Sequence, residues 1–322
     1  METPLVTVAV ISYKAADFVI ETLDSIKSQT YTNIELVVAD DASPDGTAEI
    51  CEEWIKNNAN RFVRTELIAS KTNGGVVVNS NRALNATKGE WFKIIGSDDV
   101  LLPDAIEKMM YFAAAHSDAT FMFGNQIYFN NQLSNKQSYR YDGFDIKRIC
   151  CGKQASAKGQ YHILTKSFFG CAAASIGKTD MLREIGGFDE RWPVEDWPLY
   201  INITKNGKKI FHIDDALVYR RIHCSSIMRE KDENAILSNH SVKDALGGVG
   251  FLYENSNFIW RRFYNVKQWL NGNIVKSGND KRIWKCRFWK FMARWFDPYN
   301  YYYILLIISD KILCLLSSKR NG

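Results

Sequence analysis

The stretch LVTVAVIS at residues 5–12 is a short, continuous run of apolar and β-branched residues. A strand with one face in water alternates polar and apolar side chains, whereas this run is typical of a strand buried on both faces of a parallel sheet. Comparable runs follow at residues 34–39 and 91–95, and segments with helical spacing separate them. We therefore expect an α/β domain with a mostly parallel sheet and helices on both faces.

The other expected elements follow from the same spacing and from turn residues. Helices are expected at residues 17–29, 48–57 and 76–87, after Pro103, and at residues 179–185 and 195–206. Further strands are expected at residues 62–69, 119–129 and 171–176, and residues 209–220 are β-rich. Residues 130–160 are polar with little periodicity, so we expect them to form a long excursion over the site.

Charge is distributed unevenly along the chain. The 322 residues carry a formal net charge of +5, yet residues 256–322 hold 13 Lys or Arg against three Asp. The remainder is therefore acidic, and the basic C-terminal region predicts an anionic surface as its partner. No nucleic-acid-binding motif accompanies this charge, so we do not expect nucleic acid to be that partner.

The sequence also excludes several classes of protein. Seven cysteines form no Cys-x-x-Cys pair, which indicates reduced thiols in a cytoplasmic protein. The N-terminal residues lack a basic segment followed by a long apolar core, so no signal peptide is expected. Neither GxGxxG nor GxxxxGK[ST] occurs, which disfavours a dinucleotide-binding dehydrogenase and a P-loop enzyme.

Polar side chains gather where the expected strands end, namely Ser12, Asp40, Asp41, Asp98 and Asp99. Ligands of open α/β sheets bind beyond the carboxyl ends of the strands, so these side chains should share one crevice. Crowded carboxylates repel each other unless a cation neutralises them, and Mg²⁺ or Mn²⁺ does so while leaving positions for phosphate oxygens. The alternative is that they are solvated turn residues or helix caps.

Five motifs occur in a fixed order: SYK at 12–14, ADDASPDGT at 39–47, NGG at 73–75, KGEW at 88–91 and GSDD at 96–99. Two more follow, GGFDE at 186–190 and EDWPL at 195–199. Over residues 5–225 the chain resembles family 2 of the inverting glycosyltransferases, in particular bacterial O-antigen and capsule enzymes. The resemblance implies the A-type glycosyltransferase fold, with a nucleotide-sugar half at 1–128, an acceptor half at 129–230 and a helical, basic region at 231–322.

The resemblance also implies roles for individual residues. The nucleotide-sugar would be contacted by Ser12, Asp40, Asp41, Gly74, Asp98 and Arg221, with the Asp41 carboxylate accepting a hydrogen bond from the N3–H of uracil. Mn²⁺ or Mg²⁺ would be held by Asp98, Asp99 and His223, and Asp196 with Glu195 would supply the catalytic base. Two positions depart from the family pattern: Gly96 replaces the first Asp of the usual D-x-D-D stretch, and Ser80 replaces an Arg after the glycine-rich turn.

Together these residues would carry out a single displacement. The metal stabilises the charge that builds on the diphosphate leaving group, and a carboxylate takes the proton of the attacking hydroxyl. Attack from the opposite face inverts the anomeric centre. Non-catalytic readings stay open for Glu195 and Asp196, because acidic side chains are favourable at a helix start, and for His223, which follows an ordinary strand end.

The C-terminal region has a pattern of its own. Residues 281–296 combine six basic with six aromatic residues, and the spacing of Trp284, Phe288, Phe291 and Trp295 is helical. A basic, aromatic amphipathic helix is typical of a membrane interface, and a helical cap packed on the main domain is the alternative. We expect a cytoplasmic protein bound peripherally to the inner face of the membrane.

The predicted function is therefore a metal-dependent, inverting transfer of a hexose, glucose or galactose, from a UDP-sugar to a glycan hydroxyl. Membrane proximity favours an undecaprenyl-diphosphate-linked acceptor in the synthesis of a surface polysaccharide such as lipopolysaccharide. Two alternatives remain open. One is an inactive sugar- or nucleotide-binding module, which Gly96 favours. The other is a nucleotidyltransferase, which needs more basic residues after the first strand than Lys14 provides.

Overall fold

The computed structural model describes most of the first 222 residues. It covers residues 3–130, 136–137, 156–165, 171–192 and 194–222, and in the C-terminal region Trp284, Phe288, Phe291 and Met292. The chain divides into two units, Met1–Glu230 and Lys231–Gly322, so nearly all described residues belong to the first. Within this described part, no helix has both the length and the apolar character needed to cross a bilayer.

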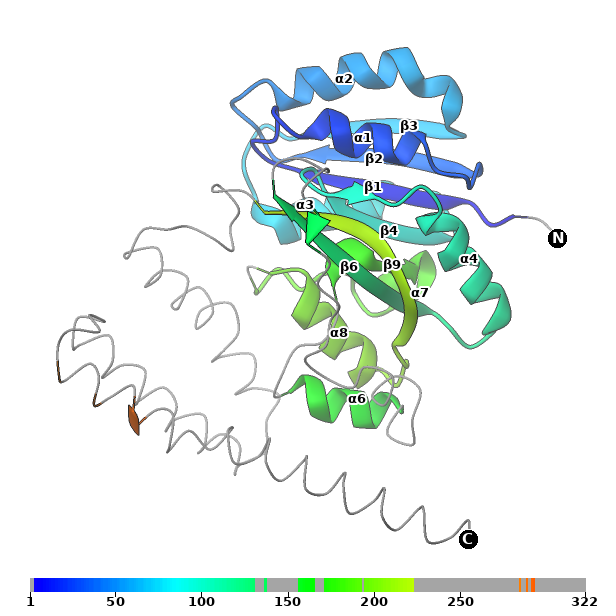
Figure 1. Cartoon of the computed structure of the whole chain (residues 1–322), viewed down its shortest axis with the longest axis vertical. Helices are drawn as coiled ribbons and strands as arrows, with labels where there is room; N and C mark the ends of the chain where they lie inside the picture. Colours follow the sequence, from blue (N-terminus) through cyan, green and yellow to red (C-terminus); the bar gives the residue numbers. More distant parts are fainter. Residues whose placement is uncertain are drawn as a thin grey trace, which may run out of the picture. The chain divides into compact units, whose positions relative to one another are not determined.

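One mixed sheet organises the first unit (Figure 1). Its strands are β1 (Val6–Ser12), β2 (Ile34–Asp40), β3 (Arg64–Ala69), β4 (Trp91–Gly96), β5 (Val100–Leu101), β6 (Phe121–Asn130), β7 (Lys136–Gln137), β8 (Ser175–Lys178) and β9 (Phe211–Ile222). The strand order is β3-β2-β1-β4-β8-β6-β9-β5, and β7 pairs with β6. The pairs β1–β2, β1–β4, β2–β3 and β6–β9 are parallel, as the buried apolar runs predict.

Helices cover both faces of this sheet, as expected. The helices are α1 (Val19–Lys27), α2 (Thr47–Asn58), α3 (Gly75–Ala86), α4 (Ala105–Ala115), α6 (Ala157–Leu164), α7 (Thr179–Glu184) and α8 (Asp196–Lys205). α1 and α2 lie side by side, joined by a 2.9 Å hydrogen bond from Trp54 Nε1 to Asp24 Oδ1. The chain returns from β3 past two strands to β4, and right-handed crossovers then place α3 on the opposite face. There α7 contacts α3 through Arg183.

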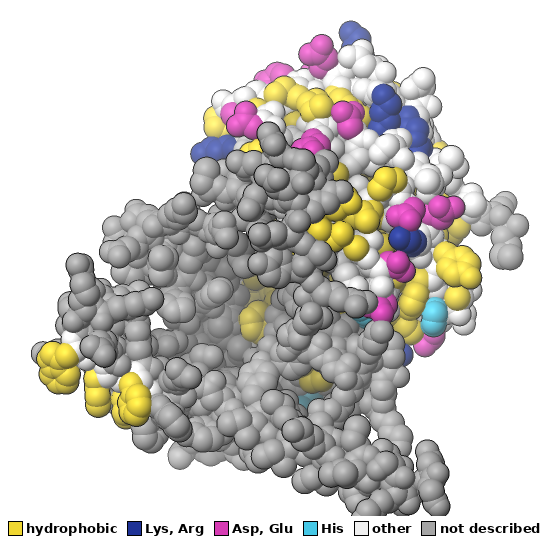
Figure 2. All heavy atoms as spheres, in the orientation of Figure 1, with side chains coloured by type: hydrophobic (Ala, Val, Ile, Leu, Met, Phe, Trp, Pro, Cys, Tyr) yellow, Lys and Arg dark blue, Asp and Glu magenta, His cyan; other side chains and the backbone are white. Residues whose placement is uncertain are grey.

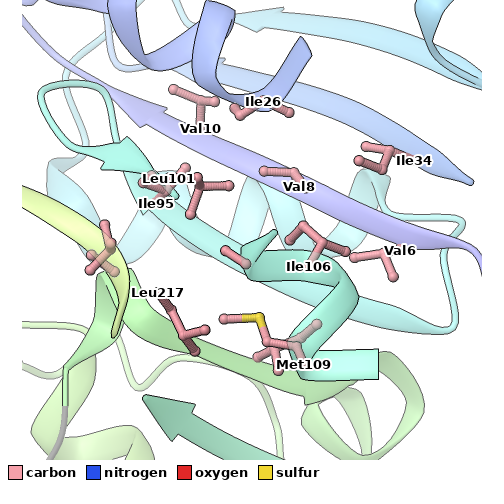
Figure 3. Packing of buried hydrophobic residues seen from close by; sticks show 14 of the residues in the cluster. Val6, Val8, Val10, Ile26, Ile34, Ile95, Leu101, Ile106, Met109 and Leu217 are labelled. Carbon is pink, nitrogen blue, oxygen red and sulfur yellow. The ribbon is translucent and has the colours of Figure 1, made fainter. Parts of the chain in front are cut away.

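The largest apolar core lies between β1 and the helices α1 and α4 (Figure 3). Val6, Val8 and Val10 are fully buried and occupy alternate positions of β1, so they share one face of the sheet. Opposite them lie apolar side chains from other elements, including Ile26, Ile106, Met109 and Leu217. At ~1.5–3 kcal/mol for each fully buried aliphatic side chain, this cluster fixes the register of the central strands.

The KGEW motif has a structural role near the amino-terminal ends of β1 and β2. Glu35 is fully buried in β2 and accepts hydrogen bonds from the backbone N–H groups of Lys88, at 2.8 Å, and Gly89, at 3.2 Å. Thr7 and Arg64 also donate to this carboxylate, and together these contacts hold its pKa below its ordinary value despite burial. A Cβ on Gly89 would lie 2.6 Å from the Thr7 backbone nitrogen, so this turn requires glycine.

The structure differs from the sequence prediction in two places. The predicted strand at 171–176 is wrong over its first half, because residues Ala172–Ala174 form a 3₁₀ turn, η2, and β8 begins at Ser175. Alanine has little strand preference, which explains why tertiary contacts decide this segment. The sequence also gave no sign of β5, whose two residues are too few to show a period. Most of the predicted excursion at 130–160 lies outside the described residues.

Charged side chains of both signs lie on the surface of the described residues. On the face drawn in Figure 2, acidic and basic side chains are interspersed among polar ones. Three of the ion pairs on the first unit are Lys108–Asp104, Lys178–Glu90 and Arg191–Asp189. Exposed pairs of this kind contribute only ~0–1 kcal/mol, so they serve solubility more than stability.

Candidate active site

The ends of β1, β2 and β4 lie side by side at the carboxyl edge of the sheet. Ser12 and Asp40 are paired residues of β1 and β2, and Gly96 pairs with Ile11. The Asp41 N–H donates to the Ser12 carbonyl at 2.9 Å, and the Ser97 N–H donates to the Ile11 carbonyl at 3.1 Å. The strand-end residues chosen from the sequence therefore belong to one continuous edge, as the rule for open α/β sheets predicts.

Asp40 is fully buried and orders the loop that follows β2. One carboxylate oxygen accepts from the Ser43 N–H at 2.9 Å, and the other accepts from the Ser43 hydroxyl at 2.6 Å. The same hydroxyl oxygen accepts from the Lys14 N–H at 2.9 Å, which ties this loop to the loop after β1. Lys14 and Ala42 have φ angles of 53° and 60°, a left-handed conformation that non-glycine residues adopt at a cost of ~1 kcal/mol or more. Both strained positions lie two residues after the ends of β1 and β2.

Asp41 is also buried, and its carboxylate has four short contacts with the β3–α3 loop and α3. The Gly74 N–H lies 2.9 and 3.1 Å from its two oxygens, the Gly75 N–H donates at 2.7 Å, and Arg82 donates at 2.7 Å in an ion pair. A carboxylate offers about four acceptor positions, so these donors already occupy it. The N3–H of a nucleobase would have to displace or share one of them.

Arg82 is a site residue that the sequence analysis missed. The family pattern places an arginine at position 80, where this chain has Ser80, a buried hydroxyl that donates to the Val76 carbonyl at 2.7 Å. Arg82 stands two residues further along α3 and reaches Asp41 instead. The signal was present in the sequence, because residues 75 and 82 are seven apart and share one face of a helix.

Ser12 presents an unsatisfied polar group at this edge. Its hydroxyl is buried, and the described residues offer it no hydrogen-bond partner. Burying an unpaired hydroxyl costs ~1–3 kcal/mol, and nearly all such groups in folded proteins have a partner. A polar group of a ligand, or a water molecule, would supply the hydrogen bond that this hydroxyl lacks.

Gly96 creates the space in which the two carboxylates after β4 meet. A Cβ at this position would lie 2.8 Å from Asp98 Oδ1 and 3.8 Å from Asp99 Oδ2, so both carboxylates approach the point where a side chain would stand. Asp98 is partly exposed, whereas Asp99 is buried and accepts a 3.1 Å hydrogen bond from the Arg221 backbone N–H. Burial and the neighbouring Asp98 charge raise the pKa of Asp99 to about 7.

This carboxylate pair fits a hard divalent cation. Among the described residues, no three His, Cys, Asp or Glu side chains form a preassembled metal site. Mg²⁺ and Mn²⁺ at phosphate-binding sites need only one or two carboxylates, because substrate oxygens and water complete the shell. Asp98 and Asp99, whose carboxylates both lie near Gly96, meet that requirement. The third predicted ligand, His223, lies outside the described residues.

The Arg221 side chain is buried among contacts with other parts of the protein. Its guanidinium pairs with Glu21, donates from Nε to the Asp98 carbonyl at 3.0 Å, and lies 4.9 Å and 4.6 Å from the ring centroids of Phe18 and Phe129. The side chain is 3% exposed. These contacts hold β9 against α1 and the end of β4, and the nucleotide contact of Arg221 stays a prediction.

Glu195 and Asp196 form a second carboxylate pair at the start of α8. Asp196 Oδ1 accepts a 2.6 Å hydrogen bond from the Trp197 N–H, which fixes the side chain at the helix terminus. Both side chains are partly exposed, and desolvation by the surrounding protein raises the pKa of Glu195 to about 7 and that of Asp196 above its ordinary value. A carboxylate with a raised pKa is a better proton acceptor, so Asp196 suits a general base.

The GGFDE motif ties this half of the domain to α3. Asn81 of α3 accepts a hydrogen bond from the Phe188 N–H at 2.9 Å and donates to the Phe188 carbonyl at 2.8 Å. The same amide donates to Glu190 at 2.8 Å. Gly186 and Gly187 have φ angles of 90° and 69°, which this tight turn requires.

Lys93, like Arg82, was not singled out in the sequence analysis. It is fully buried in the middle of β4, and its ammonium donates to the carbonyls of Ile94 and Ala173, both at 2.5 Å. Burial lowers the pKa of Lys93 to about 7, while the charge of Asp99 opposes that shift. This contact joins β4 to η2. A lysine inside an apolar strand pattern was the available signal.

The sequence profile described as "Glycosyl transferase family 2" matches residues 7–186, more than half of the chain. The chain belongs to glycosyl transferase family 2. Relatives of this family 2 glycosyltransferase include the glycosyltransferase GlyG of Streptococcus pneumoniae, 25% identical over 70% of this chain and 73% of GlyG. The minor teichoic acid biosynthesis protein GgaB of Bacillus subtilis is 28% identical over 71% of this chain but only 24% of its own length.

Solved structures share the fold of this family 2 enzyme. TarS 1-349 of S. aureus in complex with UDP-GlcNAc matches 84% of this chain and 80% of its own chain, with a TM-score of 0.55 at 18% identity. The mannosyltransferase PcManGT of Pyrobaculum calidifontis, in complex with GDP-Man and Mn²⁺, matches 93% of this chain and 72% of its own, with a TM-score of 0.52 at 17% identity. At these identities the likeness establishes the fold alone.

Proposed function

We propose that this family 2 enzyme transfers a hexose from a UDP-sugar to a hydroxyl of a glycan, with inversion at the anomeric carbon. The observation that carries the proposal is the meeting of the β1, β2 and β4 ends in one edge, with the Asp98 and Asp99 carboxylates both near Gly96. Glucose and galactose are the donors that we place first. The complexes of TarS with UDP-GlcNAc and of PcManGT with GDP-Man support a nucleotide-sugar as the donor class.

The chain's own residues divide the chemistry between two carboxylate pairs. Asp98 and Asp99 would hold Mn²⁺ or Mg²⁺, which when bound supplies Lewis-acid stabilisation of the leaving diphosphate. Asp40, Asp41 and Gly74 shape the nucleotide side of the crevice, and the free hydroxyl of Ser12 faces the same edge. On the acceptor side, Asp196 takes the proton of the attacking hydroxyl. The negative charge of the neighbouring Glu195 makes it less favourable for both carboxyl groups to be ionised at once.

A nucleotide-sugar panel tests this proposal. We expect Mn²⁺-dependent release of UDP from UDP-glucose or UDP-galactose, and slower or no release of nucleotide from UDP-GlcNAc and GDP-mannose. Release of pyrophosphate from a nucleoside triphosphate and a sugar phosphate would favour a nucleotidyltransferase instead. Binding of nucleotide-sugars without any turnover, with and without glycan acceptors, would favour the inactive module.

The pH dependence of kcat/KM follows from the acceptor-side pair. A base with a raised pKa is active above that pKa, so the acid limb of kcat/KM is expected at a pH above the ordinary aspartate range rather than near pH 4. Glu195→Gln removes one of the two like charges, and the acid limb should therefore move to lower pH. A pH–rate profile of both proteins checks this, and an acid limb that stays in place would contradict the coupling of the two carboxyl groups.

We also propose a lipid-linked glycan acceptor, such as an undecaprenyl-diphosphate glycan, and peripheral attachment to an anionic membrane surface. GgaB, whose name refers to teichoic acid synthesis, supports a surface polymer as the product class. In the C-terminal region, Trp284, Phe288 and Phe291 are 70%, 44% and 55% exposed, and their four- and three-residue spacing places them on one helix face. Basic residues of the segment 281–294 surround them in the sequence.

Membrane attachment predicts a specific loss of vesicle binding. The variant Trp284→Ser/Phe288→Ser should bind vesicles of phosphatidylglycerol and phosphatidylcholine at least ~10-fold more weakly, since each large apolar side chain withdrawn from the interface removes ~1.5–3 kcal/mol. Tyr111→Ser is the matched control, because Tyr111 on α4 is 80% exposed. Sedimentation with vesicles measures both. Equal binding of the two variants would argue against attachment through this segment.

A further inference from the structure

Strand β6 ends at the same edge of the sheet as β1, β2 and β4. It pairs antiparallel with β8, and β8 pairs antiparallel with β4, so β6 and β4 run in the same direction. Ile176 of β8 is the register partner of both Lys93 and Met122, so Gly96 is about level with Asn125. The last residues of β6 therefore lie beyond the end of β4, at the edge that carries the candidate active site.

The alternation of side chains along β6 changes phase in the middle of the strand. Met122 belongs to the apolar core beside α4, and regular alternation would place Tyr128, six residues later, on that same face. The register against β9 shifts on both sides of Asn125, however. Phe129 then takes the face of α1, with the Arg221 guanidinium 4.6 Å from its ring centroid, so Tyr128 faces the opposite side. Irregularities of this kind re-aim side chains next to active sites.

A hydrogen-bonded chain fixes the Tyr128 side chain on that opposite face. Cys171 Sγ donates to Gln126 Oε1 at 2.8 Å, and Gln126 Nε2 donates to the Tyr128 hydroxyl at 2.8 Å. Gln126 and Cys171 are buried, whereas Tyr128 is partly exposed. The strand partners of Tyr128, Arg220 on β9 and Gln137 on β7, flank its backbone on both sides. An aromatic side chain that is held in this way loses little conformational freedom when a ligand packs against it.

The helix that starts at Asp196 packs on the same face of β6. The ring of Tyr200 on α8 lies edge-on to Phe121 with the centroids 5.0 Å apart, and its hydroxyl donates to the Cys171 carbonyl at 3.4 Å. Asp196 and Tyr200 are four residues apart and share one face of the helix. The candidate base therefore faces the side of the sheet on which Tyr128 lies.

The carboxylates of the donor side lie close to the same end of β6. The sheet order puts β4 and β5 on either side of β6 and β9, and the loop with Asp98 and Asp99 joins β4 to β5. The Arg221 N–H donates to Asp99, and Arg221 is the register partner of Phe129. Neighbouring strands are ~4.8 Å apart, so two strand spacings, ~10 Å, separate the backbone at Tyr128 from that at Asp99.

We propose that the ring of Tyr128 is a stacking surface for a sugar ring of the acceptor. The inference rests on the proposed function and adds a residue that selects the acceptor. A pyranose presents faces of C–H groups that pack favourably on an aromatic ring, while its hydroxyls stay free for hydrogen bonds. Stacking at Tyr128 holds the attacking hydroxyl near Asp196. The acceptor is thereby a cyclic sugar rather than an open-chain polyol.

Stimulation of Mn²⁺-dependent UDP release by octyl β-D-glucopyranoside, octyl β-D-galactopyranoside and ribitol 5-phosphate tests the proposal on the whole chain. With the better glycoside, Tyr128→Leu is expected to raise the acceptor KM ~5-fold or more at unchanged kcat and donor KM, because stacking contributes to binding alone. Tyr128→Phe keeps the ring but not the hydroxyl, and its acceptor KM should stay within ~2-fold of the wild type. Tyr111→Leu is the control, because Tyr111 is an exposed tyrosine on α4.

Several results would overturn the assignment. An unchanged acceptor KM in Tyr128→Leu, or a rise in the donor KM alone, would mean that the ring does not contact the acceptor. Equal losses in the Leu and Phe variants would leave the hydroxyl a structural link to Cys171, and stronger stimulation by ribitol 5-phosphate would exclude a cyclic acceptor. Where circular dichroism shows that Tyr128→Leu does not fold, Tyr128→Met replaces it. Failure of the folded wild type to release UDP from any donor would instead refute the proposed function itself.

Discussion

Replacing Asp196 by asparagine is expected to lower kcat at least ~10²-fold, the scale of a lost general base. The amide oxygen of asparagine can still accept the 2.6 Å hydrogen bond from the Trp197 N–H, so the start of α8 should keep its geometry. Donor affinity should stay within about twofold, because Asp196 acts on the acceptor. Steady-state kinetics with a saturating acceptor, together with calorimetric UDP binding, measure the two quantities separately.

The control for this variant is Asp180→Asn. Asp180 occupies the first turn of α7, so its replacement removes an acidic charge from a comparable helix start outside the crevice. We expect its turnover to equal that of the wild type. Turnover of Asp196→Asn within about threefold of the wild type would remove Asp196 from the mechanism and leave only its helix-terminal role.

The second large effect is expected at Asp99. The variant Asp99→Asn keeps an oxygen for the Arg221 backbone N–H, so it changes the charge of the site with little change of packing. Lewis-acid stabilisation is worth several kcal/mol and each 1.36 kcal/mol is a factor of ten, so we expect kcat/KM to drop by ~10²–10³. Initial rates measured over a range of Mn²⁺ concentrations check this.

Asp104→Asn serves as the control for Asp99→Asn. Asp104 precedes α4, its side chain is 42% exposed, and it pairs with Lys108 one turn later. Its loss should leave the rate and the Mn²⁺ requirement unchanged. If Asp99→Asn turned over like the wild type at every Mn²⁺ concentration, Asp99 would be a buried structural acid rather than part of a metal site.

The sheet and its functional edge could be predicted because they depend on local signals. Residues 5–12, 34–39 and 91–95 are mostly apolar runs that are typical of buried strands, and all three are strands in the structure. The polar residues directly after such strands then necessarily meet, since parallel strands end at the same edge. This is why Asp41 and Asp99 could be assigned to one edge before their contacts were known.

The contacts themselves were not predictable, because they depend on register and on helix placement. Arg82 reaches Asp41 only because α3 packs over β2, and the Arg221 backbone N–H reaches Asp99 only because β5 pairs with β9 in one register. The sequence did not show which face of the sheet Arg221 would take, and in the structure its side chain lies toward α1. Lys93 shows the same limit, since its partners are carbonyl groups rather than side chains.

The structure changes the interpretation of Gly96. From the sequence, the loss of an aspartate favoured an inactive binding module. In the structure, the missing side chain is the space into which the Asp98 and Asp99 carboxylates turn, and an aspartate here would meet Asp98 Oδ1 at 2.8 Å from its Cβ. Full activity is therefore compatible with glycine at this position, provided that Asp98 and Asp99 suffice for the cation.

The central claim is that carboxylates from strand ends hold a cation that in turn binds the donor diphosphate. Titration calorimetry of UDP into the wild-type protein, once with Mn²⁺ and once with EDTA, tests it most directly. The account predicts that Mn²⁺ strengthens UDP binding by ~10-fold or more, equivalent to about 1.4 kcal/mol. Equal affinity for UDP in the two buffers would contradict it.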